Sequence, residues 1–474
     1  MLAGTGLQLA ARVTTAVASA STFVMLGRHL DDRALGVFNL HFTLFLILGA
    51  LVDFGSMSIA VREATRRPDR EPAVIRAVFR LRLRLAALCF SIYAVLAWLD
   101  AGGSERLALL LLGALHLFAT APAAAAAWLQ SRVRLTAIAL APIVGFGLYL
   151  AASTTACALG VKEPALFVAA FGLGLAVQAL VPWTAARARG VVVRGAIDRE
   201  LARELLRAMV PLGISATVST LYFRMDALLL RHLVGPEANG LYARTFPLLS
   251  FSIALPAYFS AALFPAMTRA AARGTGDLLA LARRSCAVLA GFALPAAFLC
   301  FSWGGQALWL VWARHANGQS LAGFSAANPE LLRCVPLLAV AGVAIFLTYP
   351  QMHALTALGR QRVLARISLT ALIVKFVLSS LAIRRFGVPG AALATAIAEV
   401  GVFAWASVEL RRAAGGFALS RAMVRPLLAA LPVGAVAALF RELAPLPTLA
   451  AAVALAAGGA FLAGSLPLKL GIEE

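Results

Sequence analysis

Two apolar segments of this chain carry polar and charged side chains at helical spacing. In residues 6–27 such side chains recur at intervals of four, three, four and three: Gln8, Arg12, Thr15, Ser19 and Thr22. A helix would present all five on one stripe. A guanidinium within a membrane helix is costly unless it faces a bundle interior or an aqueous cavity. The stripe therefore predicts a polar cavity, with hydrogen bonding to a neighbouring helix as the alternative.

A second stripe lies in residues 209–232, where the intervals are four, three and four: Ser215, Ser219, Tyr222 and Asp226. Arg224 is two residues from Asp226, which places their side chains about 200° apart around a regular helix. Both cannot face one cavity unless the helix is distorted. Either side chain could instead pair with a neighbouring helix.

Further ionisable residues fall inside apolar segments. Asp53 and Arg62 lie near one end of the second segment and could gate that side. Arg244 lies in the eighth segment. Lys375 and Glu399 lie on consecutive segments, which favours a structural ion pair. Three histidines are scattered in a way that favours core or pore-lining positions over metal ligands: His41, His116 and His353.

Catalytic and cofactor-binding motifs are missing from the sequence. There is no phosphate-binding loop, no HExxH and no Ser–His–Asp arrangement. The five cysteines form no CxxC and lie in apolar runs: Cys89, Cys157, Cys286, Cys300 and Cys334. We therefore expect neither an enzyme nor a metal site or cofactor.

The elements that must position these residues are membrane helices. Hydrophobic residues make up 61% of the 474 and charged residues 13%, about half the share in soluble domains, and mean hydropathy is +0.87. A spanning helix needs about 20 apolar residues. The sequence therefore predicts an all-α integral membrane protein of about 14 transmembrane helices. The spans are 6–27, 36–60, 83–99, 107–129, 136–160, 165–186, 209–232, 240–266, 285–304, 332–355, 363–383, 389–410, 425–441 and 447–466.

Orientation follows from the basic residues. Of the 42, 28 lie in or beside the even-numbered connections or the tail, 10 lie on the other side and four lie within apolar segments. This asymmetry predicts cytoplasmic N- and C-termini. It also places the net charge of +21 beside the anionic inner leaflet and argues against a nucleic-acid partner. Arg199, Arg203 and Arg207 share one face of a predicted short amphipathic helix, 198–208, on that leaflet.

An internal repeat organises the spans. GRHLDDRALGVFNL at 27–40 and LRHLVGPEANGLYART at 230–245 share Arg-His-Leu, a polar loop and a Gly-x-aromatic helix start, about 203 residues apart. That offset of six helices preserves topology and predicts parallel repeats. We expect pseudo-symmetric six-helix lobes at 1–208 and 209–415, then two additional helices and a tail at 416–474. The offset aligns Arg12 with Ser215.

Four motifs carry a family resemblance: DFGSMSIAVREATRR (53–67), YFRMDALLLRHLVGPEANGLYA (222–243), ALTALGRQRV (354–363) and FGVPGAALATAIAEV (386–400). Together they resemble the polysaccharide-transporter, or O-antigen-unit flippase, family. That family belongs to the multidrug/oligosaccharidyl-lipid/polysaccharide exporter superfamily, which also holds drug exporters and the lipid II flippase. The resemblance implies two six-helix lobes around a cationic cavity. It also implies alternating-access transfer of an undecaprenyl-diphosphate-linked oligosaccharide across the bacterial inner membrane, toward the periplasm.

Site roles follow from this resemblance. Arginine suits a diphosphate because its planar fork matches phosphate oxygens. Arg12 and Arg224 are the candidates for that contact, and Arg244 is a further candidate for substrate binding. The acids and the hydroxyl stripes are candidates for sugar contact or for coupling to H⁺ or Na⁺: Thr15, Ser19, Asp53, Ser215, Ser219, Tyr222 and Asp226. Membrane lipids and, as an open possibility, a polysaccharide polymerase or other assembly protein are the expected partners. The alternatives are an ion-coupled multidrug exporter, a lipid II flippase and a non-transporting membrane scaffold.

Overall fold

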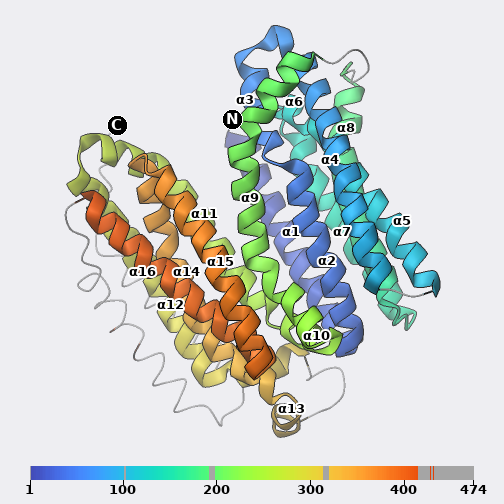
Figure 1. Cartoon of the computed structure of the whole chain (residues 1–474), viewed down its shortest axis with the longest axis vertical. Coiled ribbons are helices and arrows are strands. Elements are labelled where there is room, and N and C mark those ends of the chain that lie inside the picture. Colours follow the sequence, from blue (N-terminus) through green and yellow to red (C-terminus); the bar gives the residue numbers. More distant parts are fainter. Residues whose placement is uncertain are drawn as a thin grey trace. The chain divides into compact units, whose positions relative to one another are not determined.

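A computed structural model describes residues 2–100, 103–191, 198–312 and 320–414, together with Leu428 and Leu431. All regular structure in these residues is helical (Figure 1). The elements are α1 (Leu2–His29), α2 (Asp32–Asp53), α3 (Ser56–Arg66), η1 (Pro68–Arg70), α4 (Glu71–Asp100), α5 (Gly103–Ala119), η2 (Pro122–Ala124), α6 (Ala125–Ser131), α7 (Thr136–Ala158), α8 (Pro164–Arg187), α9 (Arg199–Leu233), α10 (Pro236–Ala243), α11 (Phe246–Arg273), α12 (Thr275–Trp312), α13 (Leu321–Ala327), α14 (Pro329–Ala357), α15 (Gln361–Phe386) and α16 (Val388–Ala414).

The predicted all-α membrane fold is confirmed. Ten segments of the described chain are long and apolar enough to cross a membrane. Each of the first twelve predicted spans coincides with a helix or with two or three closely spaced helices. The predicted spans 425–441 and 447–466 lie outside the described residues, apart from Leu428 and Leu431.

Three predicted spans are interrupted. The span 36–60 divides into α2 and α3 at Phe54 and Gly55, which both adopt left-handed backbone angles, with φ +42° and +71°. The span 107–129 divides into α5, η2 and α6 where Pro122 removes a backbone donor. The span 240–266 divides into α10 and α11, and Pro247 stands in the first turn of α11. Apolar composition alone does not reveal such turns.

The prediction of a separate amphipathic helix at 198–208 is wrong. Those residues are the first turns of α9, a continuous helix of 35 residues that begins at the N-cap Asp198. Asp198 accepts hydrogen bonds from the amides of Glu200 and Leu201. Leu201 and Leu205 pack into the protein core rather than against a leaflet.

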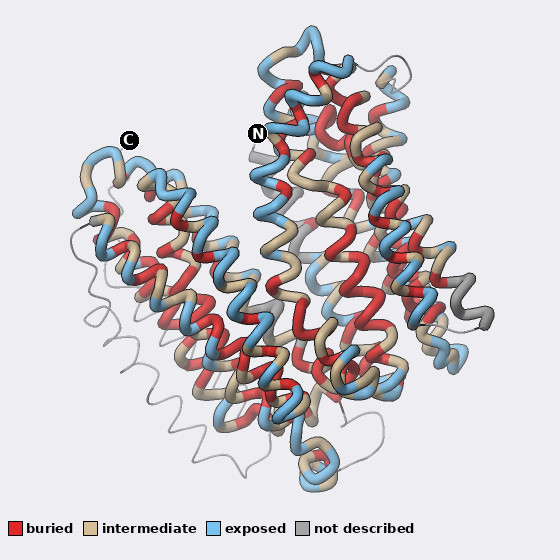
Figure 2. The backbone as a smooth tube through the Cα atoms, viewed as in Figure 1, coloured by how far each residue is buried: buried red, intermediate tan, exposed pale blue. Residues whose placement is uncertain are grey.

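By internal contacts the chain forms two compact units, residues 1–243 and 244–474. In the first, α2 packs against α10, α9, α4 and α8, α7 packs against α1 and α8, and α5 packs against α8. Figure 2 shows α2 buried over most of its length. The predicted lobe boundaries at 208/209 and 415/416 stay predictions.

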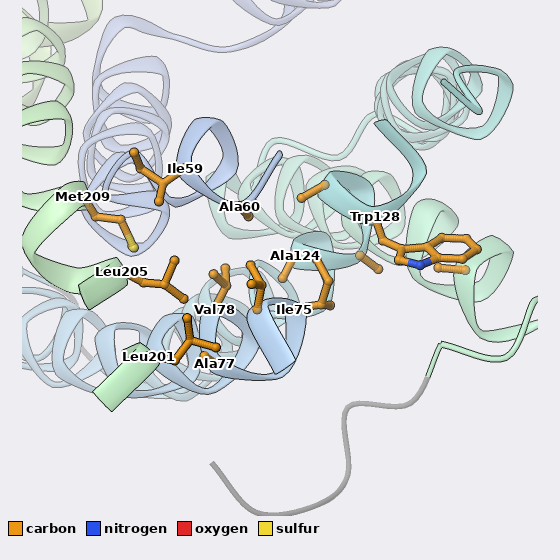
Figure 3. Close-up of a cluster of buried hydrophobic side chains, with 14 of the residues drawn as sticks. Ile59, Ala60, Ile75, Ala77, Val78, Ala124, Trp128, Leu201, Leu205 and Met209 are labelled. Atoms are coloured by element: carbon orange, nitrogen blue, oxygen red, sulfur yellow. The ribbon is translucent and has the colours of Figure 1, made fainter. Parts of the chain in front are cut away.

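One end of the first unit is closed by an apolar cluster contributed by α3, α4, α6 and α9 (Figure 3). Ile59, Ile75, Val78 and Leu205 are each 2% exposed or less. Four segments far apart in sequence therefore converge at this end, and α10 lies at the opposite end of the unit (Figure 1).

In the second unit α14 is the central helix and packs against α11, α12 and α16, while α15 packs against α16. Lys375 on α15 and Glu399 on α16 are 1% and 4% exposed. Both are buried on two packed helices, and their pairing stays a prediction.

Candidate functional site

The predicted α9 stripe separates into exposed and buried halves. Ser215 and Ser219 are exposed, whereas Tyr222 and Asp226 are 8% and 2% exposed. The phenol of Tyr242, on α10, donates to an Asp226 oxygen at 3.4 Å. The structure therefore brings Asp226 against α10, while the two serine hydroxyls stay uncovered.

Arg224 points to a different neighbour. Its guanidinium carbon lies 5.0 Å from the centre of the Phe42 ring on α2, within cation–π range. Since α9 is a continuous helix through this region, Arg224 and Asp226 face different partners, as their spacing implies. This half-buried cation thus lies against an aromatic ring.

Two hydroxyl groups of the predicted stripe on α1 form hydrogen bonds within α1 itself. The Thr15 hydroxyl donates to the Ala11 carbonyl at 2.6 Å, and the Thr22 hydroxyl donates to the Ala18 carbonyl at 2.8 Å. Ser19 is half-buried. Arg12 and Gln8 lie on α1, but their side chains are outside the described part of the chain.

Arg244 belongs to the second unit, which begins at this residue. Its guanidinium carbon lies 5.9 Å from the ring centre of Trp312, the last residue of α12. The predicted site residues of α1, α2 and α9 lie in the first unit, so Arg244 is assigned to a different compact body.

Among the predicted site residues, Asp53 has a carboxylate that binds both an arginine and a hydroxyl group. It ends α2, and its carboxylate accepts a charge-assisted hydrogen bond from Arg82 of α4. Ser56, at the start of α3, donates to the same carboxylate oxygen at 3.5 Å. Arg82 also donates to the Ser56 hydroxyl at 2.6 Å and to the Thr120 carbonyl at 3.2 Å. One guanidinium thus holds both sides of the α2–α3 turn.

Asp53 and Arg62, which the sequence places near the same end of the second segment, have different partners, and their gating role stays a prediction. Arg62 donates to its neighbour Glu63 at 2.9 Å. Arg82, which the predicted spans leave among the basic residues of the connection 61–82, is 3% exposed within α4. Its position was readable from spacing, since it continues a stripe whose other members are all buried: Ile75, Val78, Ala86, Cys89, Tyr93 and Ala97.

At the opposite end of the unit, α2 and α10 approach at two glycines. A Cβ on Gly36 would fall on the Pro236 carbonyl oxygen, and a Cβ on Gly240 would fall on the Asp32 carbonyl oxygen. Each glycine meets the residue four positions before the other. This reciprocity is what a local two-fold axis between the helices produces, and it joins the two copies of the sequence repeat.

Buried amides complete this crossing. Asn39 donates to the Asn239 side-chain oxygen at 2.8 Å, and Asn239 donates to the Gly36 carbonyl at 2.8 Å. Both asparagines are buried, so their hydrogen bonds fix the register of the contact. An ion pair between Arg33 and Glu237, at 3.5 Å, is largely exposed.

The end that carries the apolar cluster is held by ion pairs. Arg67 binds both Glu204 oxygens, at 3.1 and 3.3 Å, and ties α3 to α9. Arg132 binds Glu71 at 2.6 Å. The hydrogen bond and charge of Glu204 raise the pKa of the Arg67 guanidinium, and those of Glu71 raise the pKa of Arg132. Both arginines therefore stay charged at this end.

The polar groups of the first unit can bind anions and hydroxyl groups. No cluster of three or more His, Cys, Asp or Glu side chains suited to a metal occurs among the residues that the structure describes. The five cysteines are free thiols. The first unit carries cations, hydroxyl groups and carboxylates on its membrane-spanning helices.

Comparisons with known proteins relate the chain to a sequence family and to membrane transporters of known structure. The family described as "Polysaccharide biosynthesis protein" matches residues 1–271. None of the curated protein sequences matches the chain. Among solved structures, a lipid II flippase MurJ in an inward closed conformation superposes with a TM-score of 0.76 at 11% identity, over 98% of both chains.

Two further structures extend the likeness. An inward-facing MATE-family multidrug-resistance transporter of the MOP superfamily has a TM-score of 0.64 at 13% identity, over 87% of this chain and 99% of that chain. A MOP-superfamily transporter from Pyrococcus furiosus has a TM-score of 0.55 at 15% identity, over 86% and 93%. At these identities the likeness establishes the fold, a two-lobe membrane transporter fold.

Proposed function

Because this chain belongs to the polysaccharide biosynthesis protein family, we propose that it is a flippase for lipid-linked saccharides. Its substrate is an undecaprenyl-diphosphate-linked oligosaccharide, which it moves from the cytoplasmic to the periplasmic leaflet of the bacterial inner membrane by alternating access. Both termini are cytoplasmic in this proposal. It involves no catalytic step, and coupling is to H⁺ or Na⁺.

The observation that carries the proposal is the position of Arg224. It is a cation in the interior of a 35-residue spanning helix, held over the Phe42 ring. Two exposed serines, Ser215 and Ser219, lie on the same helix, on the stripe that faces away from Arg224. A guanidinium can bind a diphosphate bidentately, and hydroxyls can exchange hydrogen bonds with sugar hydroxyls. A cationic drug would be repelled by the same arginine, which disfavours the multidrug-exporter alternative.

Arg12 and Arg244 would extend this set of diphosphate contacts, and Thr15, Ser19 and Tyr222 the set of sugar contacts. Anionic membrane lipids fit the basic end of the first unit, which bears Arg67 and Arg132. A polysaccharide polymerase or another assembly protein is the protein partner that this function would need. Nucleic acid has no place in it.

Lipid II is a second candidate substrate. The MurJ structure covers 98% of this chain, whereas the MATE structure covers 87%, so the fold agrees over more of the chain with a lipid-carrier flippase. Both candidate substrates present a diphosphate on a polyprenyl carrier, so the same arginines would serve either.

Reconstitution separates the candidates. The purified full chain is placed in liposomes that contain a fluorescent lipid-linked oligosaccharide, lipid II or a cationic dye, and leaflet exchange or efflux is measured. We expect rapid exchange of the oligosaccharide and none of the dye. Faster exchange of lipid II than of the oligosaccharide would transfer the assignment to lipid II. Protein that moves none of the three would favour the scaffold alternative.

A further inference from the structure

Three phenylalanines recur on α2 at intervals of four and three residues: Phe38, Phe42 and Phe45. A helix presents residues at this spacing on one face. All three are buried, and Phe42 is the most exposed of them at 7%. Helix α2 packs against both α8 and α9, so side chains on its surface can contact either neighbour.

Phe42 is one end of an aromatic column that continues through Phe171 on α8 to Tyr149 on α7. The ring centres of Phe42 and Phe171 are 4.7 Å apart, and those of Phe171 and Tyr149 are 5.2 Å apart. Phe171 and Tyr149 are 2% and 3% exposed. The column therefore crosses three helices inside the first unit.

The two helices behind Phe42 are in direct backbone contact. A Cβ on Gly145 of α7 would lie 2.5 Å from the Gly174 carbonyl oxygen, and a Cβ on Gly174 of α8 would lie 2.6 Å from the Gly145 carbonyl oxygen. Gly145 is one turn from Tyr149, and Gly174 is three residues from Phe171. Since α7 and α8 cannot approach further, they give the column a fixed support.

The guanidinium of Arg224 lies at the Phe42 end of the column, with its central carbon 5.0 Å from the ring centre. The face of an aromatic ring is the negative part of its quadrupole and attracts a cation within about 6 Å. Arg224 is half-buried, which strengthens such an attraction because less water competes for the cation. The column therefore ends on a cation of α9.

Other arginines of the first unit are held differently. Arg67, Arg82 and Arg132 each bind a carboxylate. A carboxylate cancels the charge of a guanidinium and occupies its N–H donors, whereas an aromatic face does neither. The contact with Phe42 thus fixes the Arg224 guanidinium without itself using the charge and the planar fork that phosphate oxygens recognise.

We propose that Phe42 is the positioning residue of the diphosphate site, and that its ring face holds the Arg224 guanidinium where it binds the phosphate oxygens. The proposal rests on the function proposed above and identifies the residue that sets the affinity for the diphosphate. Loss of the ring face lowers the fraction of protein with Arg224 in place and weakens binding by the same factor. The maximal rate of the saturated transporter is unchanged.

Progressive fluorination of the ring at position 42 tests the proposal, because fluorine withdraws charge from the ring face and changes its size little. Full-length protein is made with mono-, di- or trifluorinated phenylalanine at this position. Calorimetry in detergent then measures the Kd for farnesyl diphosphate, a soluble diphosphate on an isoprenoid chain. We expect a stepwise rise in Kd, to about fivefold for the trifluorinated ring and about tenfold for Phe42→Leu.

Phe45 is the matched control. It is 1% exposed, and among the described residues its ring contacts are with Tyr93, His116 and Phe171 rather than with an arginine. Fluorination of Phe45 should leave the Kd within about twofold of the wild-type value. A second control needs no ligand: fluorination at position 42 should lower the melting temperature of the wild type and leave that of Arg224→Met unchanged.

A Kd that does not respond to fluorination at position 42, or that responds equally at Phe45, would overturn the proposal. Leaflet exchange of the lipid-linked oligosaccharide is measured in parallel, and its half-saturating concentration decides if farnesyl diphosphate does not bind. A lower maximal rate with an unchanged half-saturating concentration would mean that Phe42 is only structural. Fluorination-dependent binding without any exchange would instead sink the flippase function and leave the diphosphate site in place.

Discussion

The two ends of the first unit are held together by different kinds of interaction. At one end α2 and α10 touch backbone to backbone through Gly36 and Gly240, with buried amides at the contact and an ion pair, Arg33–Glu237, that is largely exposed. At the other end α3, α4, α6 and α9 enclose an apolar cluster ringed by arginine–carboxylate pairs. The first contact depends on shape, whereas the second combines apolar burial with ion pairs at the surface. Salt or pH should therefore act on the second end and leave the first unchanged.

The largest effect is expected at the glycine crossing. Gly36→Ala places a Cβ on a backbone carbonyl oxygen that no side-chain rotation can move away, so we expect a loss of about 3 kcal/mol or more and little protein in the membrane. Membrane abundance and thermal unfolding in detergent are the measurements. Gly147→Ala is the matched control, because nothing lies within 4 Å of its added Cβ. Normal abundance of Gly36→Ala would show that the crossing is not tight.

Asp53→Ala is expected to come next. It leaves the buried Arg82 without its carboxylate, which should cost about 3 kcal/mol, the lower end of the range because Asp53 is partly exposed. Arg82→Met should cost less, since the remaining carboxylate can be hydrated. Arg62 is paired with the adjacent Glu63, and Arg62→Ala should stay within about 0.5 kcal/mol. Equal losses for Arg62 and Arg82 variants in thermal unfolding would contradict the Asp53–Arg82 brace.

The buried amides should show an intermediate effect. Asn39→Ala leaves the Asn239 side-chain oxygen without its donor, at a cost of about 1–3 kcal/mol. A double-mutant cycle with Asn239→Ala should give a coupling energy of about 0.5–3 kcal/mol that does not change with salt. Additive losses would mean that the two asparagines act independently.

The smallest effect belongs to the surface pair at the charged end. Glu204→Gln removes a carboxylate that is 53% exposed and should cost less than about 1 kcal/mol. The loss should shrink as salt is raised, since exposed charges are screened. A larger loss that persists in high salt would place this pair among the structural contacts and weaken the contrast between the two ends.

Much of the fold was predictable because long apolar segments in a sequence strongly indicate membrane-spanning helices. The all-α fold and the family suggested by the four motifs are confirmed. The repeat at 27–40 and 230–245 also anticipates a structural fact, since its two glycines meet at the α2–α10 crossing.

The turns and the Asp53 environment were predicted less well. Left-handed backbone at Phe54 has no signature in hydropathy. Arg82 was counted with a basic connection because Arg80 and Arg84 flank it, although only Arg82 lies on the buried stripe of α4. Reading charged residues against helical periodicity, rather than counting them by connection, would have placed it in the core. The roles assigned to the substrate-site residues stay predictions.

The central claim is that Arg224 binds the diphosphate of a lipid-linked oligosaccharide, and leaflet exchange in liposomes tests it most directly. Arg224→Ala should lower exchange by at least tenfold at normal abundance, and Arg224→Lys should recover only part of it, because an ammonium lacks the planar fork. Arg12→Ala should act in the same direction. Lys375→Ala, a buried cation in the second unit, should act through abundance instead. Exchange that is unchanged in Arg224→Ala and Arg12→Ala, with both proteins at wild-type levels, would contradict the account.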